Sequence, residues 1–215
     1  MSELFSIQLQ NRQQQGRDGV WLDLPTTTEQ VQAALRQIGI SSDNPQGLFI
    51  SGYFAEEEKR FAIPYNMVLA SNVDELNFLA SRLETLSTGE RAELNAALQA
   101  PQSELFSIGR ITDFPENVDY YVHLPDVHGP AQLGDYYLNR SGMVDMPEEW
   151  KGGIDTAQFG RYVAQQEQGV FTEYGYLVKS GDAWQKVHEG QPVPEEYRVL
   201  SFPAPEVLRD SANIP

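Results

Sequence analysis

The sequence predicts an α+β fold of three small domains, in which two α/β modules with small mixed or antiparallel sheets flank a helical middle domain. Three observations predict this class: apolar residues alternate near the start of the chain, helical periodicity fills its middle, and strand-like runs return after residue 100. A chain of 215 residues is long enough for two or three small domains. We expect the domains at 1–65, 66–101 and 102–202, followed by a tail at 203–215.

Three strands are expected in the first module. Phe5, Ile7 and Leu9 alternate with polar residues, which is typical of a half-buried strand. A polar turn leads to a second strand at 20–24, and a third follows at 48–54. Strands joined by short polar turns favour a small sheet in this module.

A helix is expected between the second and third strands. Thr26 is the predicted N-cap, because Glu29 follows three residues later as in a capping box. Gly39 is placed to end the helix in the left-handed conformation. The residues between them predict one apolar face, formed by Val31, Ala34, Leu35 and Ile38.

The middle domain is expected to be entirely helical. Asn72 with Glu75 predicts the start of one helix, and Ser87 with Glu90 predicts the start of the next. Pro101 cannot continue the second helix, so the domain should end there.

The third domain is expected to repeat the pattern of the first. The hexapeptide SELFSI occurs at 2–7 and again at 103–108, and a Leu-Pro pair follows each copy at a similar distance. An internal duplication of a strand–loop–strand–helix unit would explain this, and so would a chance similarity between two strands.

Further elements are expected later in the third domain. A strand is expected at 120–124, and Asp155 with Gln158 should open a helix. The runs 170–178 and 183–187 predict a hairpin.

The charge balance excludes several classes of function. Lys and Arg number 15 and Asp and Glu number 31, which gives a net charge of −16. A chain this acidic is not expected to bind a nucleic-acid backbone or an anionic membrane, whereas basic proteins remain possible partners. Without cysteine, disulfides, thiolate catalysis and thiolate metal sites are excluded. The start of the chain lacks the pattern of a signal peptide, and no apolar run is long enough to span a membrane, so we expect a cytoplasmic protein.

No motif predicts a catalytic, cofactor or metal site. His123 and His128 are five residues apart in a loop-forming stretch, which does not match the spacing of a helical zinc pair. The phosphate-binding glycine motifs and the nucleophile elbow are also absent from the sequence. We therefore expect no cofactor and no metal, although a hydrolase that uses two carboxylates stays open as an alternative.

Acidic residues are dense in one stretch that also contains aromatic residues. From Asp113 to Asp155 the sequence contains nine acidic residues and only two basic ones, Arg140 and Lys151, which gives a local net charge of 2 − 9 = −7. This pattern fits an ordinary acidic surface. It also fits a folded scaffold that displays carboxylates in place of phosphates, because duplex DNA likewise presents a dense array of negative charge.

Several stretches, in their order along the chain, resemble the ArdA antirestriction proteins carried by mobile elements. They are spread over most of the chain: WLDLP at 21–25, NVDELNFLA at 72–80, LGDYY at 133–137, IDTAQFGR at 154–161, FTEYGY at 171–176 and PEEYRV at 194–199.

The resemblance implies an elongated three-domain protein that dimerises through its C-terminal domain, 102–202. It implies an acidic DNA mimic that occupies the DNA-binding groove of type I restriction–modification enzymes and inhibits them stoichiometrically, without being an enzyme. Together with the charge pattern, it leads us to expect a DNA-mimic surface formed by Glu56, Glu57, Glu58, Asp74, Glu75, Asp113, Glu116, Asp119, Asp126, Asp135, Asp145, Glu148, Glu149 and Asp155.

Two other roles compete with this prediction. A protein of the same build could inhibit another nucleic-acid enzyme, such as a CRISPR effector. An acidic adaptor could bind a basic protein outside its DNA groove, in which case added DNA would not displace it.

Overall fold

The computed structural model describes residues 4–14, 18–56, 60–101 and 103–205. The chain divides into two compact units. The first unit comprises Met1–Arg60, Pro64–Ser81 and Val193–Pro215, and the second comprises Phe61–Ile63 and Arg82–Pro192. Both contain helices and a small antiparallel sheet, so the predicted α+β class is confirmed. The division into three domains stays a prediction.

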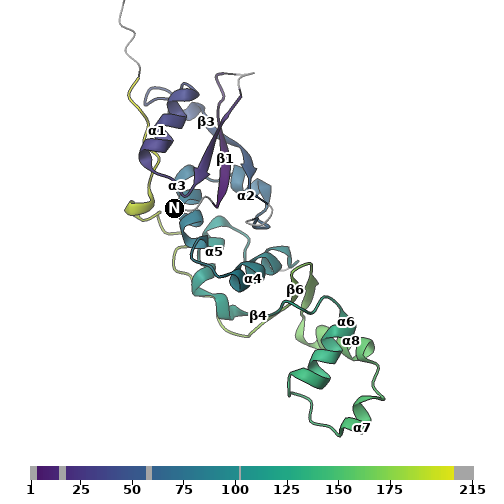
Figure 1. Cartoon of the computed structure of the whole chain (residues 1–215). Helices are drawn as coiled ribbons and strands as arrows, with labels where there is room; N and C mark the ends of the chain where they lie inside the picture. Colours follow the sequence, from purple (N-terminus) through teal and green to yellow (C-terminus); the bar gives the residue numbers. More distant parts are fainter. Residues whose placement is uncertain (1–3, 15–17, 57–59, 102, 206–215) are drawn as a thin grey trace, which may run out of the picture. The chain divides into compact units, whose positions relative to one another are not determined.

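The sheet of the first unit has three strands in the order β2-β1-β3 (Figure 1). Its members are β1 (Phe5–Asn11), β2 (Val20–Leu24) and β3 (Leu48–Phe54), all antiparallel and all at the predicted places. Apolar and polar residues alternate along β1, so its apolar side chains fill the core on one face of the sheet.

Helix α1 (Thr28–Gln37) lies beside this sheet and buries the predicted apolar face. Its N-cap is Thr27 with Gln30 as the reciprocal partner, so the prediction of Thr26 with Glu29 was wrong by one residue. The physical reason is that the backbone N–H of Thr26 is bound by the side-chain oxygen of Asn77. Gly39 adopts a φ of +66°, as expected for the end of this helix.

Helices α2 (Tyr65–Leu69) and α3 (Val73–Leu83) follow the sheet in the chain. At the start of α3, Asn72 and Glu75 exchange side-chain to backbone hydrogen bonds, which confirms the predicted start. Asp74 accepts hydrogen bonds from the backbone N–H groups of Val199 and Leu200, both at 2.7 Å. Part of the chain's last segment is thereby held on the first unit.

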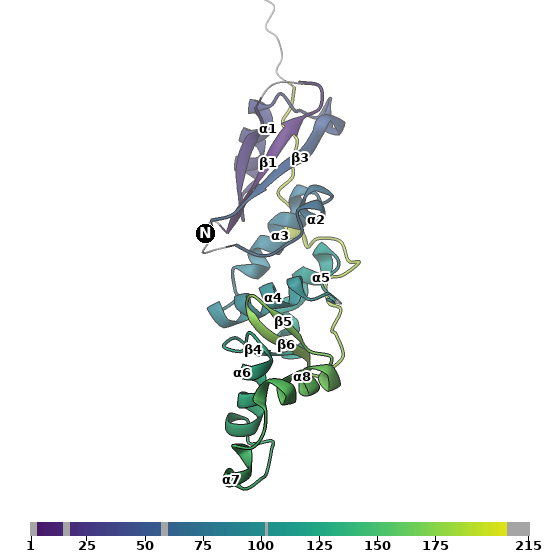
Figure 2. The ribbon, with the colours of Figure 1, turned by 90° about the vertical axis from the view of Figure 1, so that its right-hand side faces the viewer.

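The second unit contains helices α4 (Thr88–Gln99) and α5 (Ile108–Thr112) and a second three-stranded sheet. The order of its strands is β4-β6-β5, and they are β4 (Tyr121–Leu124), β5 (Val170–Thr172) and β6 (Gly175–Lys179) (Figure 2). The Ser87–Glu90 capping box of α4 is confirmed.

The predicted hairpin between 170–178 and 183–187 was wrong. The hairpin forms within the first of these runs, between β5 and β6, and 183–187 contains no strand. Gly175, with a φ of +119°, makes the tight turn possible.

Helices α6 (Pro130–Asp135) and α8 (Thr156–Glu167) pack closely against each other, and α7 (Glu148–Lys151) lies between them in the chain. A Cβ atom on Gly134 would lie 1.9 Å from the carbonyl oxygen of Thr156, and one on Gly160 would lie 1.8 Å from that of Pro130. The two glycines therefore permit direct backbone contact. A π-helical turn, Tyr136–Arg140, continues α6.

The repeated hexapeptide does not produce a repeated structure. The described part of the first copy enters β1, whereas the second copy leads into α5. The side chain of Ser107 caps α5 by accepting a hydrogen bond from the backbone N–H of Arg110. Ile108 and Ile111, three residues apart, are then buried on one face of that helix. The interpretation of the repeat as a duplicated strand unit is therefore corrected.

Candidate functional site

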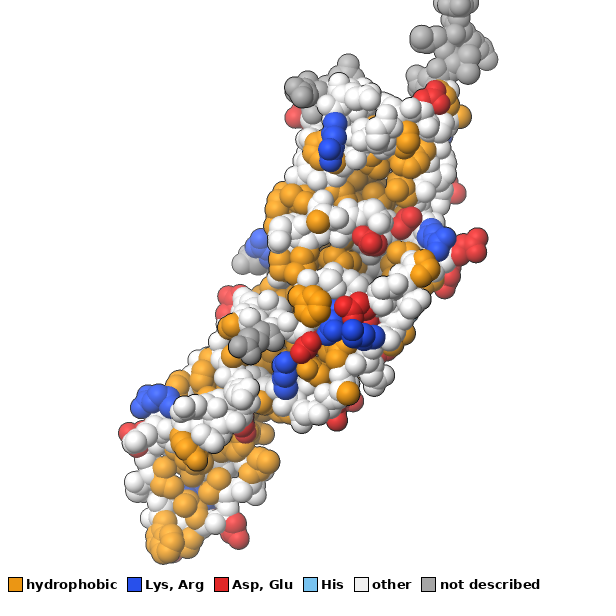
Figure 3. Space-filling view, turned by 180° about the vertical axis from the view of Figure 1, so that it is seen from behind, with side chains coloured by type: hydrophobic (Ala, Val, Ile, Leu, Met, Phe, Trp, Pro, Cys, Tyr) orange, Lys and Arg blue, Asp and Glu red, His pale blue; other side chains and the backbone are white. Residues whose placement is uncertain are grey.

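The acids expected to form the DNA-mimic surface differ in exposure. The exposed ones are Glu56, Asp119, Asp126, Asp145, Glu148, Glu149 and Asp155. The half-buried ones are Asp74, Glu75, Glu116 and Asp135. Glu57 and Glu58 lie outside the described residues. On the face seen in Figure 3, acidic side chains are scattered among polar and hydrophobic ones.

Asp113 does not lie on the surface. Its exposed fraction is 0%, and its carboxylate accepts hydrogen bonds from three successive backbone N–H groups, those of Val187, His188 and Glu189, at 3.2, 2.6 and 3.2 Å. Because these bonds satisfy the buried charge, Asp113 fixes the segment 187–189 inside the second unit. Its assignment to a DNA-mimic surface is corrected.

The half-buried acids also make contacts that hold the fold. At the start of α3, Glu75 accepts a hydrogen bond from the backbone N–H of Asn72, while Asp74 accepts those of Val199 and Leu200. Glu116 forms an ion pair with Arg82, and Asp135 forms one with Arg140 at 3.4 Å. Much of their charge is therefore matched within the chain.

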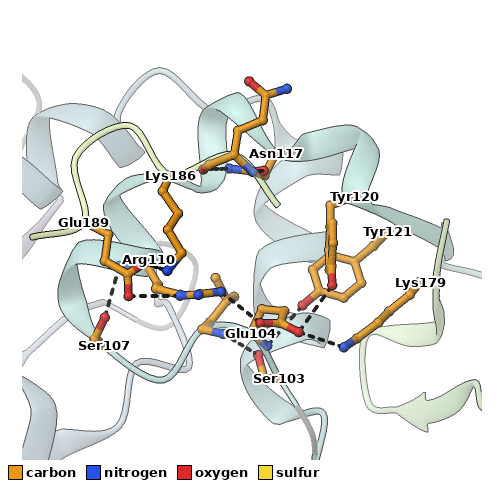
Figure 4. A network of polar contacts seen from close by, with 12 residues as sticks. Ser103, Glu104, Ser107, Arg110, Asn117, Tyr120, Tyr121, Lys179, Lys186 and Glu189 are labelled. Carbon is orange, nitrogen blue, oxygen red and sulfur yellow. Dashed lines mark hydrogen bonds and ion pairs between the residues drawn. The ribbon is translucent and has the colours of Figure 1, made fainter. Parts of the chain in front are cut away.

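Glu104 is the centre of a polar network that the sequence did not predict (Figure 4). Its carboxylate accepts hydrogen bonds from Arg110 at 2.8 Å, from Lys179 at 2.9 Å and from the hydroxyl of Tyr120 at 3.3 Å. The hydrogen bond from Lys179 is the largest cause that lowers the pKa of Glu104. Arg110 also binds Glu189 at 3.1 Å, so one buried guanidinium joins two carboxylates.

Two aromatic rings flank the same guanidinium. The carbon Cζ of Arg110 lies 4.6 Å from the centre of the Phe106 ring and 5.7 Å from that of Trp184. A planar cation between ring faces and carboxylates is a favourable arrangement for arginine. Arg110 and Lys179 are therefore both engaged by carboxylates of their own unit.

Glu93 on α4 is the most perturbed carboxylate described. Burial is the largest cause that raises its pKa to about 8, and the negative charges of Glu90 and Asp119 contribute to the same rise. Its Oε1 is buried and has no hydrogen-bond partner among the residues that the structure describes. Ala96 and Ala97, three and four residues later and hence on the same side of the helix, are buried, and this spacing was the available sequence indication.

Glu167 at the end of α8 is a further acid with an internal role. It accepts hydrogen bonds from the hydroxyls of Tyr137 and Tyr176, at 2.5 and 3.0 Å. Burial, followed by this hydrogen bond, raises the pKa of Tyr176. We call five acids of the second unit its internal carboxylates: Glu93, Glu104, Asp113, Glu116 and Glu167. We call four exposed acids of the same unit its exposed carboxylates: Asp119, Asp126, Asp145 and Glu149.

Among the described residues, Asp113, Glu116 and His188 have metal-ligand atoms within 4.8 Å of one another. Asp113 already accepts three backbone N–H groups, and Glu116 is paired with Arg82, whose positive charge opposes a cation. The geometry therefore supports a structural role for this group.

These features define an acidic α+β protein whose perturbed and buried polar groups act mainly in holding the fold. The chain matches the antirestriction protein (ArdA) family over residues 15–178, which is more than half of its length, and it belongs to that family. The family consists of inhibitors of restriction, so a restriction enzyme is the partner that membership indicates. No curated protein matches the chain. In the described part of the chain, no helix is long and apolar enough to cross a membrane.

Proposed function

We propose that this protein is an acidic DNA mimic that occupies the DNA-binding groove of a type I restriction–modification enzyme in the cytoplasm and inhibits it stoichiometrically. Membership in an antirestriction family and a net charge of −16 support the proposal. The observation that carries it is the setting of exposed acids on folded elements. Glu149 lies in α7, and Asp155 is the N-cap of α8.

The mechanism is electrostatic and depends on a preformed scaffold. Because folding has already placed these carboxylates, little ordering entropy is lost when they bind. Lys and Arg side chains that normally contact phosphates would contact Asp and Glu instead. Attraction over distance speeds the encounter, and added salt weakens it by screening.

We further propose that the protein acts as a homodimer joined through the second unit. Large apolar side chains are exposed on the stretch from α6 to α8: Met143 is 75% exposed, Trp150 is 68% exposed, and Tyr162 is also exposed. Figure 3 shows hydrophobic side chains gathered at the end of this unit, in the lower left of the view. Burial of such side chains favours association.

The experiment is a competition assay with the full chain. A type I methyltransferase core bound to labelled duplex DNA would be titrated with the protein at two salt concentrations, and light scattering would give the protein's mass in solution. We expect displacement near one dimer per enzyme that weakens at high salt. Displacement that ignored salt, or a failure to displace DNA at either concentration, would overturn the DNA-mimic proposal.

A further inference from the structure

The outer face of the first unit's sheet, opposite its core, carries two exposed aromatic rings. Trp21 is 49% exposed and Phe54 is 57% exposed, although both lie on well-paired strands. Trp21 is opposite Gln8 and Phe54 is opposite Ser6, so both rings share the face of β1 that points away from the core. Their ring centres are 6.4 Å apart in an edge-to-face arrangement.

A hollow of about 220 Å³ opens beside Phe54 on this unit. We call it the sheet hollow, and its lining residues are Leu4, Phe5, Ser6, Asp23, Phe54, Ala55 and Glu56. One water molecule requires a volume of about 10–15 Å³, so the hollow is large enough for a group much bigger than water. Its described lining residues include two carboxylates, and no Lys or Arg is among them.

Asp23 is held in position at the hollow. The hydroxyl of Ser6 donates a hydrogen bond to its Oδ1 at 2.6 Å, and the two residues face each other across β1 and β2. The other carboxylate, Glu56, already takes part in an interaction within the chain. Asp23 is exposed, and the hydrogen bond from Ser6 among the described residues occupies only its Oδ1, so Asp23 is the acid on which the site depends.

The second unit contains a similar combination of an aromatic ring and two carboxylates, and there the combination binds an arginine. There, a phenyl ring and two carboxylates surround the guanidinium of Arg110, with the ring centre of Phe106 at 4.6 Å and oxygens of Glu104 and Glu189 at 2.8 and 3.1 Å. The sheet hollow has an exposed phenyl ring and two carboxylates as well, and none of its described lining residues is an arginine.

We propose that the sheet hollow binds an arginine side chain of a basic partner protein. The methylene stem would lie against Phe54, whose ring packs edge-to-face with that of Trp21, and the guanidinium would bind Asp23. A planar guanidinium can stack on a ring and bind a carboxylate at the same time, which an ammonium group does less well. The inference rests on the proposed function only for the identity of the partner, since the site can be tested with a free peptide.

The test is a titration of the full-length protein with acetyl-Gly-Arg-Gly-amide, followed by NMR of the indole N–H signals. Trp21→Phe assigns the Trp21 signal among those of the three tryptophans. We expect saturable shifts of this signal with the arginine peptide, and binding weaker by about tenfold with the matching lysine peptide. Equal binding of the two peptides, or a Trp21 signal that does not shift, would overturn the proposal.

Matched variants separate the hollow from bulk charge. Asp23→Asn should weaken binding of the arginine peptide by about tenfold, whereas Asp43→Asn, which removes the same charge from an exposed loop of the first unit, should change it less than about twofold. Phe54→Ala should weaken binding as well, and because the ring is exposed, the fold should persist. Equal losses in Asp23→Asn and Asp43→Asn would overturn the proposal.

The same proteins in the DNA competition assay distinguish this inference from the proposed function. If the wild-type protein does not bind the arginine peptide at the sheet hollow but still displaces DNA, only the proposal for the hollow is overturned. Peptide binding that depends on Asp23, in a protein that fails to displace DNA, would support the hollow and overturn the DNA-mimic proposal.

Discussion

The internal and exposed carboxylates of the second unit lie close in sequence but serve different purposes. Asp113 is enclosed by three backbone N–H groups, whereas Asp119, only six residues later, is exposed. Glu104 and Glu116 neutralise arginines of the same unit. The difference shows that fewer carboxylates are available to a partner than the sequence contains, because some of them are bound inside the protein.

The largest effect is expected for an internal carboxylate. Asp113→Asn places an amide N–H₂ against backbone N–H groups and should lower the free energy of unfolding by about 2–4 kcal/mol. Urea denaturation would measure the change. Asp126→Asn removes an exposed charge and should change stability by less than about 0.5 kcal/mol. If the two variants were equally stable, the division into internal and exposed carboxylates would fail.

A smaller effect, of opposite sign, is expected at Glu93. The folded protein keeps this proton up to a pH of about 8, whereas the unfolded chain releases it near the ordinary value of 4.5. The free energy of unfolding should therefore fall as pH rises between these values. Glu93→Gln should remove that fall and stabilise the protein at pH 8 by roughly 1–2 kcal/mol, a figure reduced for partial exposure.

Denaturation curves from pH 5 to pH 9 would measure the Glu93 effect. Glu149→Gln on exposed α7 removes the same charge and serves as the control, since it should leave the pH profile unchanged. A wild-type profile identical to that of Glu93→Gln would contradict the raised pKa.

The smallest effects are expected from single exposed carboxylates. Asp126→Asn, Asp145→Asn and Glu149→Gln should each weaken DNA displacement by less than about twofold, because a distributed contact shares its energy among many pairs. The triple variant should lose more and depend less on salt. Competition curves at two salt concentrations would measure both quantities. One substitution that abolished displacement would indicate a focused site instead.

Local patterns predicted much of the fold because their causes are local. Alternation in Phe5, Ile7 and Leu9 is enough to predict β1, and the caps at Ser87 and Asp155 depend on residues three positions away. The N-cap at Thr27 could not be predicted, because the competing bond to Thr26 comes from Asn77, 51 residues further along.

The candidate site was less predictable for the same reason. In sequence, Asp113 does not differ from the acidic residues near it. It is internal because the backbone of 187–189, more than 70 residues later, donates hydrogen bonds to it. The Arg110 network joins positions up to 79 residues apart, and the sheet hollow combines β1, β2 and the end of β3. Such groupings depend on tertiary contacts that no short pattern contains.

The contact between Asp74 and the segment at Val199 and Leu200 has a consequence for the order of synthesis. Val199 and Leu200 follow Asp74 by 125 and 126 residues, and the side chain of Asn77 likewise donates a hydrogen bond to the carbonyl of Tyr197, 120 residues later. At about 5–20 residues per second, roughly 6 to 25 seconds separate the translation of Asp74 from that of its partners. The unit that begins at the N-terminus is therefore completed only after the whole second unit has left the ribosome.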